Sequence, residues 1–112
     1  MSALALVALL VISVRGGQST QDRTRALMER AQAAEQRENL DEAAEAYREI
    51  LRLHPHWAAA KFNLGLVYYT QKRNTEAIRF FTEALQDDSS LADACLFRGV
   101  AFYRTNQFGE AR

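Results

Sequence analysis

The stretch from Ala60 to Leu85 reads AKFNLGLVYYTQKRNTEAIRFFTEAL, and its Glu76-Ala77 pair decides the fold because the pair recurs at a fixed spacing. The same pair stands 34 residues earlier and 34 residues later, at Glu42-Ala43 and Glu110-Ala111. Small residues keep the same register, at Ala31, Gly65 and Gly99. A fixed period of this length predicts stacked helical hairpins, each made of two antiparallel helices.

The small residues have a packing role in such hairpins. They lie where two helix backbones approach most closely, and a larger side chain there would force the helices apart. We therefore expect Gly65 and Ala77 to face each other across one helix pair, although Gly costs about 1 kcal/mol of helix propensity relative to Ala. A single hairpin cannot bury its own apolar face, so the stability of the chain depends on stacking.

The period and the small and aromatic positions closely resemble the tetratricopeptide repeat family. The resemblance covers about Thr24 to Arg112, and the residues that match best are Ala60, Asn63-Leu64-Gly65, Tyr68-Tyr69, Glu76-Ala77-Ile78, Phe80-Phe81 and Ala84-Leu85. It implies an all-α fold, a right-handed superhelical stack of antiparallel helix pairs. Within an array of residues 23–112, two full repeats (24–57 and 58–91) are followed by an incomplete third (92–112). Repeat 1 departs from the pattern at Ala34, where the others have Tyr68 and Phe102.

The register also predicts where the helices begin and end. Asp41, Thr75 and Asn106 are the expected start signals of the second helices, because Glu follows each of them where the helix dipole favours negative charge. The first helices are expected at Asp22–Arg37, Trp57–Lys72 and Leu91–Thr105. The second helices are expected at Asp41–Leu53 and Thr75–Gln86, with a third beginning at Gly109.

Residues 1–22 lie outside the repeats. The apolar run from Ala3 to Val14 (residues 3–14) is too short to span a bilayer, which needs roughly 20 residues, and it suits the core of a signal peptide. No Lys or Arg precedes the run, however, and no clear Ala-x-Ala site follows it. Three interpretations stay open: a cleaved export signal, an uncleaved membrane tether, or an apolar helix that packs on the array. The first two predict an exported, periplasmic or membrane-associated protein, and the third allows a cytoplasmic one.

The composition argues against several functional classes. With 14 basic and 14 acidic residues the formal charge is zero, so the electrostatic footprint of a nucleic-acid binder is missing. The single cysteine, Cys95, cannot form an internal disulfide, and we interpret it as a buried small side chain in preference to a reactive thiol. His54 and His56 are interpreted as solvated turn residues and not as metal ligands. Without a phosphate loop, nucleophile elbow or zinc-protease helix, the sequence predicts no enzyme, no cofactor and no metal site.

The third repeat stops early in the sequence. Arg112 falls one turn into its second helix, which leaves one side of the first helix, with Leu96, Val100 and Phe102, uncovered. We therefore expect the chain to be a fragment or the first part of a longer gene product, since such arrays usually need a polar capping helix. The apolar edge also predicts self-association.

In the tetratricopeptide repeat family, the first helices of successive repeats line a concave groove that receives an extended peptide or a partner's helix. The positions that face it are Arg25, Met28, Glu29, Gln32, Glu35 and Gln36 in repeat 1, Ala59, Phe62, Asn63, Leu66, Tyr69 and Thr70 in repeat 2, and Asp93, Leu96, Phe97, Val100, Tyr103 and Arg104 in repeat 3. The predicted binding residues are Phe62, Asn63, Leu66, Tyr69, Phe97, Val100, Tyr103 and Arg104. Asn63 is the sharpest candidate, because its amide both donates and accepts hydrogen bonds. The alternative is that Phe62 and Tyr69 only pack against repeat 3.

One subgroup of the family grips the carboxylate terminus of chaperones with a clamp of basic and amide side chains. The clamp positions of this chain hold Met28, Gln32, Asn63, Asp93 and Phe97. Only Asn63 matches, and Asp93 has the opposite charge, so capture of a chaperone tail is not expected. The resemblance implies a scaffold that binds a protein or peptide partner. The alternative is the non-catalytic repeat region of a longer enzyme, such as a glycosyltransferase or a signalling kinase.

Overall fold

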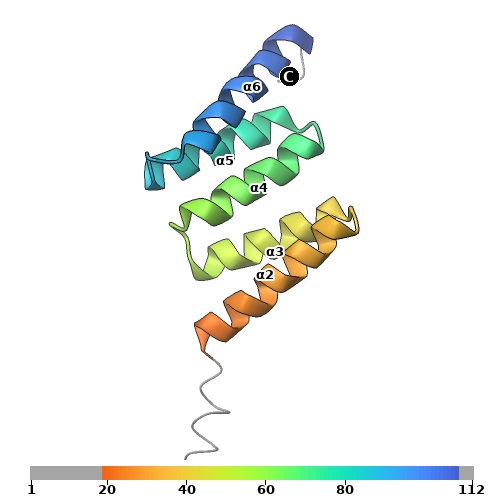
Figure 1. Cartoon of the computed structure of the whole chain (residues 1–112), viewed down its shortest axis with the longest axis vertical. Helices are drawn as coiled ribbons and strands as arrows, with labels where there is room; N and C mark the ends of the chain where they lie inside the picture. Colours follow the sequence, from red (N-terminus) through yellow and green to blue (C-terminus); the bar gives the residue numbers. More distant parts are fainter. Residues whose placement is uncertain (1–18, 109–112) are drawn as a thin grey trace, which may run out of the picture.

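The computed structural model describes residues 19–108, and short turns join the helices within this range. The helices are α2 (Thr20–Gln36), α3 (Leu40–Leu53), α4 (Ala58–Thr70), α5 (Asn74–Asp87) and α6 (Ala92–Phe108). Figure 1 shows them stacked in chain order along the long axis. Each helix packs against the next, and the described residues contain no strand. The predicted all-α stack of helix pairs is confirmed.

The core alternates small and large side chains between the helices. Tyr47, Ile50, Leu64 and Phe81 are at most 2% exposed. Truncating a buried residue of this size to alanine costs about 2–5 kcal/mol. The recurring small positions that the structure describes are also buried, except Gly99, and they are Ala31, Ala43, Gly65 and Ala77.

The turns inside repeats 1 and 2 contain a left-handed residue that is not glycine. Glu38 has a φ of 59° and Lys72 a φ of 63°. The backbone N–H groups of Glu38 and Asn39 donate back to carbonyls of α2 at 3.0 and 2.8 Å, and Lys72 and Arg73 do the same to α4. This pair of bonds is the Schellman motif, which satisfies the last carbonyls of a helix. The two first helices therefore end in the same way.

The second helices begin one residue before the start signals Asp41 and Thr75, so that assignment is wrong. Asn39 caps α3 instead, because its side-chain oxygen accepts a hydrogen bond from the N–H of Glu42 at 3.3 Å. Arg73 occupies the same place before α5, but its side chain makes no cap bond. The Schellman turn returns the chain to helical geometry at once, so the residue after the left-handed one becomes the cap.

The helix α6 continues past its predicted end. It runs through Asn106, which is therefore not the start signal of a following helix, and the start expected at Gly109 lies outside the described residues. Cys95 is exposed, so its interpretation as a buried side chain is wrong. Its counterpart 34 residues earlier, Lys61, lies against α5 and pairs with Asp87 at 2.5 Å.

The close approach between α4 and α5 involves Gly65 and Phe81. A Cβ atom added to Gly65 would lie 2.6 Å from Cε1 and 2.7 Å from Cδ1 of the Phe81 ring. The predicted partner, Ala77, is fully buried, but the three nearest atoms all belong to Phe81. The ring one turn further along α5 takes that role, because it is long enough to reach the backbone of α4. A Cβ added to Gly99 would meet nothing within 4 Å.

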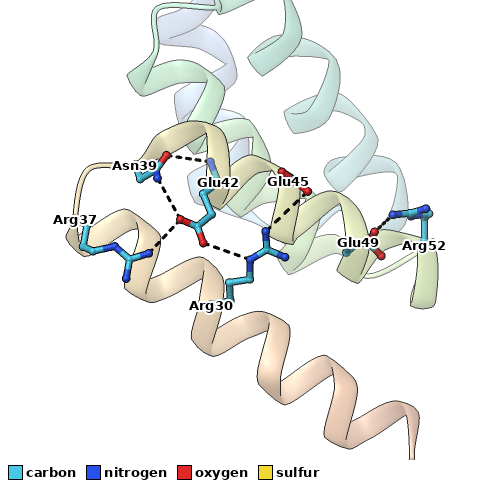
Figure 2. A network of polar contacts seen from close by, with 7 residues as sticks. All are labelled: Arg30, Arg37, Asn39, Glu42, Glu45, Glu49 and Arg52. Atoms are coloured by element: carbon cyan, nitrogen blue, oxygen red, sulfur yellow. Dashed lines mark hydrogen bonds and ion pairs between the residues drawn. The ribbon is translucent and has the colours of Figure 1, made fainter.

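A polar network joins α2 to α3 (Figure 2). The Glu42 carboxylate accepts hydrogen bonds from Asn39 and Arg37 at 3.1 Å each, and from Arg30 at 3.4 Å. The residue 34 positions after Arg30 is Leu64, which is fully buried. Repeat 2 thus buries an apolar side chain at a position where repeat 1 presents a half-exposed ion pair.

The described residues leave one apolar edge exposed on α6. Leu96 is 64% exposed and Phe102 is 48% exposed. Among the helices that the structure describes, none is long and apolar enough to cross a membrane. The run from Ala3 to Val14 lies outside the described residues, as does Arg112.

Candidate functional site

Four of the predicted binding residues pack together between α4 and α6. The centroid of the Phe97 ring lies 6.1 Å from that of Phe62 and 5.4 Å from that of Tyr69. Such separations are typical of favourable aromatic pairs. The guanidinium carbon of Arg104 lies 4.0 Å from the centroid of the Tyr69 ring, in a cation–π contact. These side chains are therefore already engaged with one another.

The other predicted residues have less of their surface engaged. Tyr103 is 63% exposed, and Leu66 and Val100 are half-buried. Asn63 is also half-buried, and its side chain makes no hydrogen bond within the part of the chain that the structure describes. Its amide keeps two donor hydrogens and an acceptor oxygen for a ligand.

The space between the first helices of repeats 1 and 2, here called the α2–α4 interval, is open. No Cα atom of α2 lies within 8 Å of one of α4, whereas α4 and α6 do approach within that distance. One cavity has walls from both α2 and α4, and a second has walls from α2 and from the turn that leads into α4. The acidic pocket has a volume of about 590 Å³ and is lined by Glu35, Glu38, Leu40, Leu66, Val67 and Thr70. The Trp57 pocket has a volume of about 540 Å³ and is lined by Gln21, Thr24, Arg25, Met28, His54 and Trp57.

The acidic pocket places two carboxylates beside apolar side chains. Glu35 and Glu38 are exposed, and neither forms an ion pair within the described residues. The hydroxyl of Tyr47 donates to Oε1 of Glu35 at 3.2 Å and so orients that carboxylate. Burial raises the pKa of the Tyr47 hydroxyl, and the charge of Glu35 raises it further. The tyrosine therefore stays protonated and remains a donor.

The Trp57 pocket is built around an indole that is 36% exposed. His54 is half-buried, and its Nε2 lies 2.7 Å from Oγ1 of Thr24. Its ring meets the indole edge-on, with the two ring centroids 5.5 Å apart. The interpretation of His54 as a solvated turn residue is therefore wrong, because the turn folds it between α2 and the indole. His56 is exposed and lies 3.3 Å from a carboxylate oxygen of Asp87. Within residues 19–108, no cluster of His, Cys, Asp and Glu that could hold a metal is found.

The register explains why one interval is open and the other is filled. Between α4 and α6, the filling residues are Phe97, Tyr69 and Arg104. The residues 34 positions earlier, in the same order, are Asn63, Glu35 and Thr70. An amide, a carboxylate and a hydroxyl thus stand where the next interval has two rings and a guanidinium, so the α2–α4 interval lacks the side chains that close its neighbour.

Sequence reasoning named only part of this surface. Arg25, Met28 and Glu35 were expected to face the groove, whereas Glu38, Leu40, His54 and Trp57 were not. The missed residues lie in turns or at the start of α3, and family positions of the first helices do not include them. The sequence did contain a signal for this part of the surface: Trp57, a large aromatic residue in the polar turn after Pro55.

Comparison with known proteins places the chain in a family. No curated protein matches it. The family model described as a tetratricopeptide repeat matches twice, at residues 15–56 and 28–92, and these matches cover most of the chain. The match agrees with the 34-residue period and with the stacked helix pairs. The chain belongs to the tetratricopeptide repeat family.

Proposed function

We propose that this chain is a protein–protein interaction scaffold that binds a peptide or a partner helix along α2, α4 and α6. Tetratricopeptide repeats generally mediate protein–protein interaction. The observation that carries the proposal is the unused amide of Asn63 beside an open interval. A half-buried amide without a hydrogen bond in the protein is suited to bond the backbone of an extended ligand, whatever the sequence of that ligand.

The aromatic packing supports this role in a second way. The contacts of Phe97 with Phe62 and Tyr69 join repeat 3 to repeat 2. Because a rigid scaffold is already ordered, it loses little conformational entropy when the ligand binds. The affinity is higher for that reason. In this proposal Leu66, Val100 and Tyr103 contribute apolar area, while Phe62 and Phe97 mainly hold the helices in place.

Site-specific photo-crosslinking tests the proposal. A photoreactive side chain is placed at Thr70 or Tyr103, or, as a control, at Arg79, which is exposed on the second helix α5. Irradiation in an extract of the source cells is expected to give discrete protein adducts from the first two positions and none from Arg79. The same adducts from all three positions, or none at any, would refute binding along the first helices.

Alanine variants then separate binding from packing. With a partner identified by its adduct, Asn63→Ala is expected to weaken binding by about 1 kcal/mol, roughly fivefold, because one backbone hydrogen bond is lost. It leaves the melting temperature nearly unchanged, whereas Phe62→Ala lowers it. Full affinity of Asn63→Ala would remove the groove hypothesis at its strongest point.

A further inference from the structure

The two ends of the α2–α4 interval differ in chemistry. At one end, Glu35 and Glu38 carry negative charge that no cation of the described residues neutralises. Arg37 is adjacent to Glu38 in sequence, but its guanidinium pairs with Glu42 at 3.1 Å. The end with these carboxylates is therefore complementary to a positively charged group.

The wall of the acidic pocket narrows the choice of cation. Leu40, Leu66 and Val67 line it beside the two carboxylates. Lysine and arginine bury their aliphatic stems along apolar surface and keep the charged head beside polar groups. A metal ion would instead need a closely spaced set of oxygen ligands, and no such cluster is found within the described residues. The pocket thus fits a basic side chain better than a free cation.

The opposite end of the interval offers apolar surface. Trp57 and Met28 line the Trp57 pocket, and the imidazole of His54 packs edge-on against the indole. Exposed aromatic residues in a hollow are frequent anchors of protein–protein contacts. Asn63 lies on α4, between Trp57 and Leu66 in the sequence, and its amide is unused.

The helix rise sets the distance between the two ends. Met28 and Glu35 are seven residues apart on α2, or about 10 Å along the axis, and Trp57 and Val67 are ten apart along the chain, or about 15 Å. An extended peptide advances about 3.3 Å per residue, so it covers this span in about four residues.

On the basis of the proposed function, we propose that the α2–α4 interval binds an extended segment of a partner protein carrying a lysine or arginine and, about four residues away, a large apolar side chain. The basic side chain enters the acidic pocket and pairs with Glu35 and Glu38. The apolar side chain packs against Trp57. The amide of Asn63 bonds the peptide backbone between them.

Selection from a library of random linear 12-residue peptides tests this assignment. The full chain is immobilised, and the enriched peptides are expected to share a lysine or arginine spaced about four residues from Leu, Ile, Phe, Trp or Met. Enrichment of acidic peptides, or of peptides without a basic position, overturns the inference but leaves the proposed function standing. Failure to enrich any peptide, together with failed crosslinking at Thr70 and Tyr103, overturns both.

Charge variants test the acidic pocket directly. Binding of one selected, fluorescently labelled peptide is measured by fluorescence polarisation. Glu35→Gln combined with Glu38→Gln is expected to weaken binding about tenfold, and raised salt weakens the wild-type complex but barely affects the variant. Glu45→Gln is the matched control, because it removes an exposed carboxylate of the second helix α3 that does not line the acidic pocket.

Charge reversal gives a test that a structural role cannot imitate. Glu38→Lys reproduces the residue at the equivalent turn of repeat 2, where Lys72 has a φ of 63°, so the fold accepts it. Repeating the selection on this variant is expected to reduce the basic preference, while Trp57→Ala reduces the apolar preference and keeps the basic one. An equal loss for Glu45→Gln and the pocket variants would show a general charge effect and overturn the assignment.

Discussion

Replacing each of the two equivalent glycines by alanine separates packing from helix propensity. At Gly65 the new methyl group would lie 2.6 Å from the Phe81 ring, which is far below van der Waals contact. Phe81 cannot easily move, because it is fully buried and its ring centroid lies 5.8 Å from that of Phe62. Overpacking of this kind costs about 1–3 kcal/mol.

At Gly99 the same substitution meets nothing within 4 Å. Alanine gains about 1 kcal/mol of helix propensity over glycine inside a helix, and this gain applies at both positions. The propensity gain therefore cancels when the two variants are compared. Their difference in unfolding free energy reports the steric cost at Gly65, so Gly99→Ala is expected to be the more stable variant by about 1–3 kcal/mol. For a domain of this size, each kcal/mol shifts the melting temperature by about 4–8 °C.

Thermal and urea denaturation followed by circular dichroism measure this difference. We expect Gly65→Ala to melt below the wild type and Gly99→Ala at or above it. Adding Phe81→Leu to Gly65→Ala relieves the clash, so the double variant loses less stability than the two single changes add up to. A melting temperature of Gly65→Ala equal to or above that of Gly99→Ala would refute the assigned contact.

Three further predictions concern a turn, an ion pair and an edge. Lys72→Gly is expected to raise the unfolding free energy by about 1 kcal/mol, because glycine adopts the observed φ of 63° without the penalty of a side chain, and urea denaturation checks it. The hydrogen bond from Lys61 holds the pKa of Asp87 below its ordinary value of 3.8. The ionised carboxylate therefore stabilises the fold fully above pH 3.8, and this stabilisation is lost as the pH falls through the lowered pKa. Asp87→Asn is therefore expected to lower the melting temperature at neutral pH but not in strong acid, and a loss that persists in acid would contradict the assignment. Leu96→Glu combined with Phe102→Glu is expected to reduce self-association through the exposed edge, and sedimentation showing that the wild type is already monomeric at high concentration would exclude it.

The repeat register was sufficient for the architecture and for the buried small positions of repeats 1 and 2. It did not predict the turns, because Glu38 and Lys72 occupy a conformation that sequence patterns assign to glycine or asparagine. The geometry of the turn determines which residue caps the next helix. Because the turn was not predicted, the sequence pattern pointed to Asp41 and Thr75, whereas the caps are Asn39 and Arg73. The close contact of Gly65 with Phe81 was not predicted for a related reason: the period shows which positions recur, but it does not show how far a long ring reaches.

The binding surface shows the same limit more sharply. A family position indicates that a side chain faces the groove, but whether the space beside it is filled depends on the residue at the corresponding position of the next repeat. Phe97 fills the space beside Tyr69, whereas its counterpart Asn63 does not fill the space beside Glu35. This comparison needs pairs of positions on neighbouring helices, which a single repeat cannot supply.

Differences between equivalent residues, more than their similarity, therefore determine what this array can bind. Shared residues such as Ala43 and Ala77 are fully buried at the same position of repeats 1 and 2. Phe97 and Asn63 occupy equivalent positions but differ in role. The ring of Phe97 joins two repeats, whereas the amide of Asn63 has no partner in the described protein. Because a ligand binds where the protein has left groups unpaired, we expect the more open of the two described intervals, the space between α2 and α4, to be the one that recognises a partner.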